Sequence, residues 1–249
     1  MNLRTLLSLL SLLAVGTAAL AQEDAVPPGF TSLFNGKDLS GWKVPEGDNG
    51  HWKVVDGVID YDAKSEATGD KSLWSEREFG DFELRLDWRI KETPFTNPNV
   101  KHVLPSGLNA RDTTGKELNL LLPDSDSGVY LRGSSKSQIN IWCWPIGSGE
   151  VYGYRMDAKM PSSVRSGVTP HTQADKPVGE WNHFDITMQG DRLTVVLNGT
   201  TVIDKAELPG IPEKGPIALQ HHGAFRDGKW SGPPSLVQFK NIAIRELKN

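Results

Sequence analysis

The stretch Asp81-Phe82-Glu83-Leu84-Arg85-Leu86-Asp87-Trp88-Arg89-Ile90 alternates charged and apolar residues from end to end. Successive side chains of a β-strand point to opposite faces of a sheet, so one face of this segment is apolar and the other is polar. The alternation does not fit the 3.6-residue period of a helix. The stretch therefore predicts a β-strand with one face in a hydrophobic core.

The same two-residue period recurs along much of the chain. After the first 21 residues, no window of 11 or more residues keeps a helical period. Gly190-Asp191 and Asn198-Gly199 are typical of tight hairpin turns. Further strands are expected at residues 128–132, 138–142, 183–188, 193–197, 201–203, 217–222 and 237–247. Many strands at hairpin spacing predict two stacked antiparallel sheets, an all-β sandwich.

Two long segments interrupt the regular strand spacing. Residues 91–127 contain prolines at positions 94, 98, 105 and 123. Residues 145–177 carry several glycines and two tyrosines, and we expect them to fold over the same edge of the sandwich. Long ordered loops usually have a function.

The amino-terminal segment has the pattern of a cleaved signal peptide. Arg4 precedes an apolar run from Leu6 to Val15, and the segment ends in Ala19-Leu20-Ala21. The run is too short for a membrane span, and no later segment reaches the roughly 20 apolar residues that one needs. We expect a signal peptide at residues 1–21, a single domain at residues 22–249, and a secreted or periplasmic protein.

Composition excludes some partners. The formal net charge of −4 argues against a nucleic-acid-binding surface. Cys143 is the single cysteine, so no internal disulfide can form, and we interpret it as a small apolar group beside Trp142 and Trp144.

Several separated motifs, in this order, resemble the 3-keto-disaccharide hydrolase family. They are Gly29–Trp42, Ser127–Arg132, Gly179–His183, Leu219–Gly223 and Phe239–Ile242. The resemblance covers nearly all of residues 29–247. It implies a concanavalin A-like, jelly-roll sandwich whose concave face binds carbohydrate. It also implies a hydrolase that acts on 3-keto-disaccharides or 3-keto-glycosides after a sugar 3-oxidoreductase has made them.

A 3-keto sugar places specific demands on a site. The ketone acidifies the hydrogen on C2, so a modest base can remove it, the glycosidic oxygen then leaves C1, and water adds across the double bond. With the family pattern in mind, we expect His222, or Asp87 in its place, to be the base. Arg132 or Gln220 would stabilise the enolate oxygen.

The polar strand faces supply the expected sugar-binding residues. Amides and guanidinium groups give directional hydrogen bonds to hydroxyls, and tryptophan rings stack on pyranose faces. If the strands lie side by side, one outer surface carries the catalytic candidates and these binding candidates: Arg89, Tyr130, Arg132, Gln138, Asn140, Trp142 and Gln220. Trp144 and Trp230 are further stacking candidates.

Other interpretations stay open at this point. A noncatalytic lectin-like module would use the same residues without a base. An ordinary retaining glucanase would need a Glu-x-Asp-x-x-Glu run, and the sequence contains none. No cofactor is expected. A divalent cation stays possible because Asp124-Ser125-Asp126-Ser127-Gly128 is acidic, although its spacing misses the calcium-loop pattern.

Overall fold

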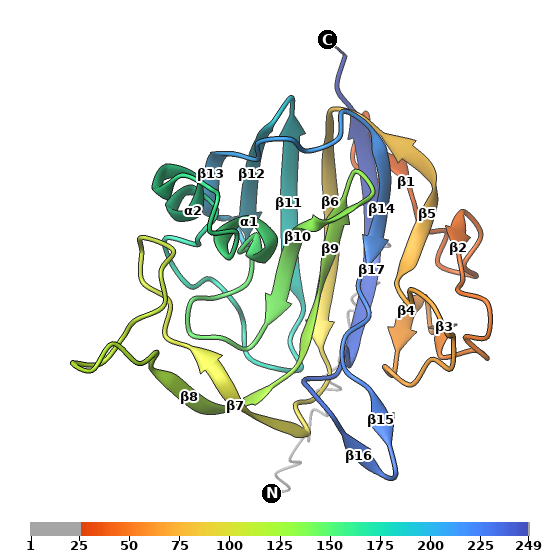
Figure 1. Cartoon of the computed structure of the whole chain (residues 1–249). Coiled ribbons are helices and arrows are strands. Elements are labelled where there is room, and N and C mark those ends of the chain that lie inside the picture. Colours follow the sequence, from red (N-terminus) through yellow and green to blue (C-terminus); the bar gives the residue numbers. More distant parts are fainter. Residues whose placement is uncertain (1–25, 249) are drawn as a thin grey trace, which may run out of the picture.

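The fold is a sandwich of two antiparallel sheets (Figure 1). The structure is a computed structural model and describes residues 26–248, so the predicted signal peptide lies outside the described residues. One sheet has eight strands in the order β13-β12-β11-β6-β17-β4-β3, with β1 paired to β17. The other has five strands in the order β10-β9-β14-β5-β2. The all-β sandwich predicted from the sequence is confirmed.

Most strands fall on the alternating segments, but β14 ends at Leu219, so the strand predicted at residues 217–222 does not reach Gln220 or His222. The eight-stranded sheet contains β1 (Thr31–Ser32), β3 (Trp52–Val55), β4 (Val58–Tyr61), β6 (Phe82–Ile90), β11 (Asn182–Gln189), β12 (Arg192–Leu197), β13 (Thr200–Glu207) and β17 (Val237–Glu246). The five-stranded sheet contains β2 (Trp42–Lys43), β5 (Leu73–Phe79), β9 (Asp126–Leu131), β10 (Ser134–Trp142) and β14 (Gly215–Leu219).

The core fills the space between the two sheets. In β6 every second residue from Phe82 to Ile90 is buried, and the charged residues between them are partly exposed. In β9 the inward residues Ser127, Val129 and Leu131 are fully buried, and Gly128 between them is buried as well. Because one face of each sheet is needed for the core, any ligand surface must come from an outer face, an edge or the loops.

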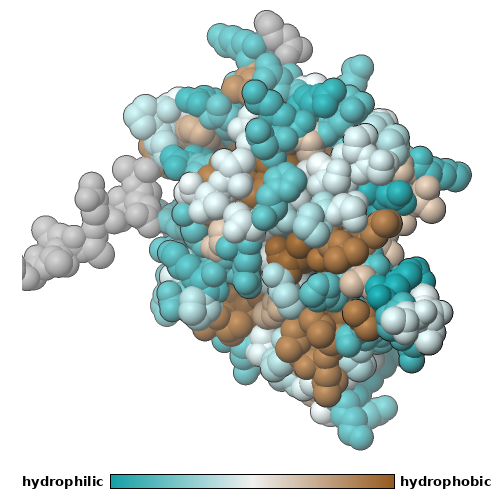
Figure 2. All heavy atoms as spheres, turned by 90° about the vertical axis from the view of Figure 1, so that its left-hand side faces the viewer, coloured by the Kyte–Doolittle hydropathy of each residue, from teal (hydrophilic) through white to brown (hydrophobic). Residues whose placement is uncertain are grey.

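The segment after β6 is a hairpin and not the open loop that its prolines predicted. Its strands are β7 (Phe95–Lys101) and β8 (Asn119–Asp124). Pro98 lies where the β7 register shifts, and the hairpin pairs with no other strand, so its prolines remove no essential ladder bond. Figure 2 views the molecule from the left-hand side of Figure 1 and shows apolar side chains gathered in the lower half of that surface. Within the β7–β8 insert, Leu104, Leu108, Leu118 and Leu121 are exposed.

The second irregular segment covers one edge of the sandwich, as the sequence predicted. It contains the short helices α1 (Tyr152–Arg155) and α2 (Ser162–Gly167), which contact β10 and β13, respectively. The buried guanidinium of Arg155 donates to Glu150, to the carbonyl of Gly107 and to the amide oxygen of Asn109. This contact fastens the β7–β8 insert to the sandwich.

Between residues 26 and 248, no helix is both long and apolar enough to span a membrane.

Candidate functional site

The outer face of the five-stranded sheet carries the polar residues that the sequence singled out. In one row across the sheet, Tyr130 of β9 pairs with Gln138 of β10 and with Ala218 of β14, and Ala218 pairs with Trp74 of β5. Paired residues point to the same side of a sheet. Gln138, Tyr130 and Trp74 therefore lie side by side on this face.

The next row is centred on a glycine. Gly128 pairs with Asn140, and its carbonyl accepts a hydrogen bond of 2.9 Å from the backbone N–H of Gln220. A Cβ atom at position 128 would lie 2.6 Å from the carbonyl oxygen of Ile139, so only glycine fits. The side chain of Gln138 lies over this glycine, since a Cβ there would also lie 2.8 Å from the Gln138 amide nitrogen.

The third row holds Asp126 and His222. Asp126 is the first residue of β9, two residues before Gly128, so it shares the outward phase of Gly128. His222 lies three residues beyond the end of β14 at Leu219, so its place beside Asp126 follows from contacts and not from strand phase. The hydroxyl of Ser235 links them: it donates to the carbonyl of Asp126 at 2.7 Å and accepts from the N–H of His222 at 2.6 Å. This hydroxyl fixes the backbones of both residues relative to each other.

The imidazole of His222 has a defined tautomer. Its Nδ1 lies 2.7 Å from the carbonyl oxygen of Pro233. A carbonyl oxygen can only accept, so in the neutral ring Nδ1 carries the proton and Nε2 carries the free lone pair. His222 is therefore arranged to accept a proton at Nε2.

Asp126 can exchange a proton near neutral pH. Its Oδ1 is buried and has no hydrogen-bond partner within residues 26–248. Burial raises the pKa of Asp126 to about 7, Asp124 adds to the rise, and the charge of His222 opposes it. From the sequence, Asp126 was considered only as part of a cation site, although its phase with Gly128 and Tyr130 indicates the same face as the sugar-binding candidates.

The amides and the phenol form a connected cluster. The amide nitrogen of Gln138 donates to the amide oxygen of Gln220. Burial raises the pKa of Tyr130 to about 12, while its hydrogen bond with Gln220 opposes the rise. Tyr130 therefore keeps its O–H as a donor at neutral pH.

Trp74 borders this cluster and was not predicted from the sequence. Its ring centroid is 5.6 Å from that of Tyr130, and its indole N–H donates to Asp70 at 2.6 Å. The side chain is partly exposed, so a sugar ring can reach it. Finding Trp74 from sequence would have required knowing that β5 lies beside β14. We call Trp74, Asp126, Tyr130, Gln138, Gln220 and His222 the site cluster.

Two predicted residues lie on the other sheet. β6 belongs to the eight-stranded sheet, so Asp87 and Arg89 do not share a surface with the site cluster, and that prediction is wrong. Asp87 is bound to His183 at 2.6 Å and to Asn241 at 2.7 Å. Arg89 donates to Gln238 at 2.6 Å and lies over the ring of Trp181.

Arg132 is also wrongly placed by the sequence interpretation. The strand ends at Leu131, and Arg132 turns away with φ of +49°. Its side chain is 2% exposed and donates to the carbonyls of Gly80, Gly190 and Pro212 and to the carboxylate of Asp81. Arg132 cross-links turns at the opposite end of β9 and has little capacity left for a ligand.

Asn140 and Trp142 share the outward face but are covered. They are 2% and 3% exposed, respectively. The ring of Trp142 stacks on Trp144 with centroids 4.1 Å apart, and its N–H donates to the carbonyl of Gly147. The stacking face predicted for a sugar is therefore occupied by another side chain.

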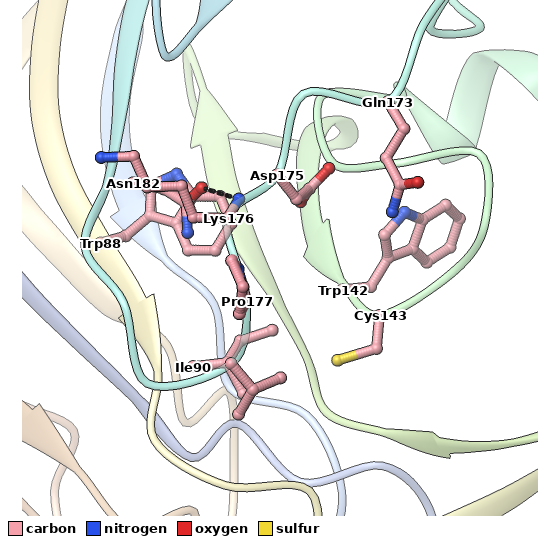
Figure 3. A pocket seen from close by; sticks show the side chains of 10 residues that line it. Trp88, Ile90, Trp142, Cys143, Gln173, Asp175, Lys176, Pro177 and Asn182 are labelled. Atoms are coloured by element: carbon pink, nitrogen blue, oxygen red, sulfur yellow. Dashed lines mark hydrogen bonds between the residues drawn. The ribbon is translucent and has the colours of Figure 1, made fainter.

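A pocket of about 350 Å³ lies outside the site cluster. Figure 3 shows Trp88, Ile90 and Pro177 on one side of it and Trp142 and Cys143 on the other. Burial raises the pKa of the Cys143 thiol to about 12, so the sulfur stays protonated and is not a nucleophile at neutral pH. A second pocket of about 330 Å³ also contains none of the site-cluster residues. Within residues 26–248, no group of three His, Cys, Asp or Glu side chains is arranged to hold a metal.

The environment of Asp126 makes a prediction about pH and stability. The folded-state pKa lies above the unfolded value near 3.9, so this group stabilises the folded state at low pH, and the effect is lost as pH rises through about 7. Asp126→Asn replaces the carboxyl with an amide that does not ionise, so the variant does not lose stability in this pH range. We expect urea unfolding at pH 8.5 to show a variant more stable than the wild type, by up to about 4 kcal/mol for a shift of about three pKa units, with a smaller gain at pH 5.5.

Asp204→Asn is the control for this measurement, since Asp204 is an exposed carboxylate on β13. An equal gain for Asp126→Asn at both pH values would show that packing, and not charge burial, sets the difference.

The two stacked antiparallel sheets, one of them with a polar outer face, define an all-β sandwich protein. The chain belongs to the 3-keto-alpha-glucoside-1,2-lyase-like domain family, whose model matches residues 29–245. This confirms the family resemblance found in the sequence.

Solved structures agree on the fold. A candidate glycosyl hydrolase from Parabacteroides distasonis ATCC 8503 superposes with a TM-score of 0.58 at 23% identity, covering 89% of this chain and 85% of that chain. Another from the same organism has a TM-score of 0.54 at 19% identity, covering 88% and 95%, respectively. A comparison with curated proteins found no match.

Proposed function

We propose that this protein cleaves the glycosidic bond of 3-keto-disaccharides or 3-keto-glycosides by elimination followed by hydration. The observation that carries the proposal is the imidazole of His222, whose Nδ1–H is held by the Pro233 carbonyl and whose Nε2 is left as a base. The family supports a carbohydrate-active enzyme of this kind.

Each step has a residue of the site cluster beside it. The Nε2 atom of His222 takes the proton from C2, and the electron pair of that C–H bond moves toward the C3 ketone. Tyr130 and the Gln220 amide donate hydrogen bonds to the oxygen where negative charge develops. The C1–O bond then breaks, leaving a C1–C2 double bond, and protonated Asp126 supplies the leaving oxygen with a proton.

Hydration completes the reaction. Water adds its oxygen to C1, and the proton held by His222 returns to C2. The proton lost by the attacking water restores Asp126. The sum is one water consumed and two sugars, or a sugar and an alcohol, released. No carboxylate nucleophile is required, which distinguishes this route from that of retaining glycosidases.

The proposal extends to location and supply. Ordinary disaccharides lack the ketone, so an oxidoreductase that oxidises C3 must act earlier. The sequence of residues 1–21 supports export, with the enzyme acting outside the cytoplasm.

The test uses the processed protein with 3-keto-trehalose, 3-keto-lactose and an aryl 3-keto-glucoside, each beside its unoxidised parent. We expect aglycone release from the keto forms only. In D₂O the released keto sugar should carry one deuterium at C2, because the returning proton comes from solvent-exchanging groups. Cleavage of the parents at a similar rate, or no deuterium at C2, contradicts elimination.

The alternative is a noncatalytic lectin-like module. It is favoured by the position of both pockets away from the site cluster, since catalytic sites commonly enclose their substrate. Binding of the parent sugars without turnover of any keto form would support this alternative.

A further inference from the structure

The hairpin of β15 (Phe225–Arg226) and β16 (Lys229–Trp230) begins directly after the proposed base. His222 is followed by Gly223, and the chain returns through Pro233 to Ser235. Figure 1 shows this hairpin projecting beyond the end of β14, away from the rest of the sandwich. It therefore extends the molecule at the end where Asp126 and His222 lie.

The base of the hairpin is fixed to His222 at several points. The Ser235 N–H donates to the His222 carbonyl at 3.1 Å, and the His222 N–H donates to the Ser235 hydroxyl at 2.6 Å. Gly223 has φ of +79°, and a Cβ there would lie 2.8 Å from the Cα of Pro234. The two sides of the hairpin are therefore in backbone contact beside the imidazole.

The hairpin carries an aromatic pair. The rings of Phe225 and Trp230 have centroids 4.8 Å apart at 56°. Trp230 packs against the hydrophobic core, while Phe225 is 40% exposed. The ammonium group of Lys64 lies 4.5 Å from the centroid of Phe225. An exposed aromatic ring beside an ammonium group suits a pyranose, which offers both an apolar face and hydroxyls.

We infer that the β15–β16 hairpin binds the sugar ring on the leaving side of the scissile bond, with Phe225 as its main contact. This inference rests on the proposed function and adds the element that holds the leaving sugar ring. Since the base that starts the elimination sits at the root of the hairpin, the ring that departs lies within reach of its aromatic pair.

The test compares a 3-keto-disaccharide with methyl 3-keto-glucoside of the same anomer, using wild type, Phe225→Ala and Phe225→Leu. We expect Phe225→Ala to raise KM for the disaccharide about 3–10-fold with little change in kcat. Phe225→Leu should give a smaller rise because apolar area is retained. Kinetics on the methyl glycoside should stay within about twofold, since it has no leaving sugar ring.

Leu121→Ala is the matched control, because Leu121 is an exposed apolar residue on β8. Equal losses on both substrates, or the same loss in the control, would overturn the inference while leaving the proposed function intact. If the wild type turns over neither substrate, the proposed function fails. Calorimetric binding of the unoxidised disaccharide and of methyl glucoside then decides the subsite: only disaccharide binding should weaken in Phe225→Ala.

Discussion

His222→Ala is expected to lower kcat/KM for 3-keto-glycosides by about 10²–10⁴-fold, the usual contribution of a general base. The alanine variant loses the Nε2 lone pair that would remove the C2 proton. It also loses the hydrogen bond to the Pro233 carbonyl, so hairpin stability has to be checked alongside turnover. Binding of the unoxidised parent sugar should change far less than kcat, because the amide and phenol cluster remains.

His221→Asn provides the control for this variant. His221 is adjacent in sequence, but its Nδ1 lies 2.7 Å from the hydroxyl of Tyr61, and burial lowers its pKa to about 4. We expect this variant to keep turnover within about tenfold of the wild type. Undiminished turnover in His222→Ala would remove the imidazole from the mechanism and leave Asp126 as the candidate base.

Arg132→Met is expected to destabilise the protein by about 3–5 kcal/mol, the range for breaking one partner of a buried ion pair. The guanidinium supplies bonds to three carbonyls and to Asp81, which methionine cannot replace. The loss should appear as a lower melting temperature and a lower urea midpoint.

A sugar-binding measurement tells whether Arg132 is a structural cross-link or the ligand-binding residue that the sequence predicted. Measured well below the melting temperature, affinity for the parent disaccharide should match the wild type, because the Arg132 side chain is 2% exposed and is bound to turns, not to the site cluster. The length of the six-residue strand β9, about 20 Å, also separates Arg132 from Asp126. Weaker binding with unchanged stability would restore the ligand role that the sequence indicated.

Sequence periodicity identified most strands but not their neighbours. The alternation from Phe82 to Ile90 specified which residues of β6 face the core. It carried no information on which sheet β6 joins, because side-chain period is the same in both sheets. For this reason Tyr130, Gln138, Gln220 and His222 were correctly expected on one surface, and Asp87 was wrongly added to them.

Local backbone geometry explains the remaining errors. In the sequence, Arg132 continues the outward phase of Gly128 and Tyr130. In the structure β9 ends at Leu131, and the positive φ of Arg132 turns its side chain out of that phase. Asp126 was weighed only as a metal ligand, since neither its burial nor its nearness to His222 can be derived from an acidic run. Trp142 was correctly phased, yet its cover by Trp144 depends on the turn that follows β10.

The positions of Arg132 and His222 at opposite ends of the sandwich have a consequence for engineering. The end with Arg132 ties the turns of both sheets together, and the end with His222 carries the two projecting hairpins. Exchanging the tip at residues 226–229 therefore leaves every bond of Arg132 in place. Variants with different residues at 226–229 can therefore be made on one unchanged sandwich and screened for cleavage of new leaving groups. They need no compensating mutations in the core.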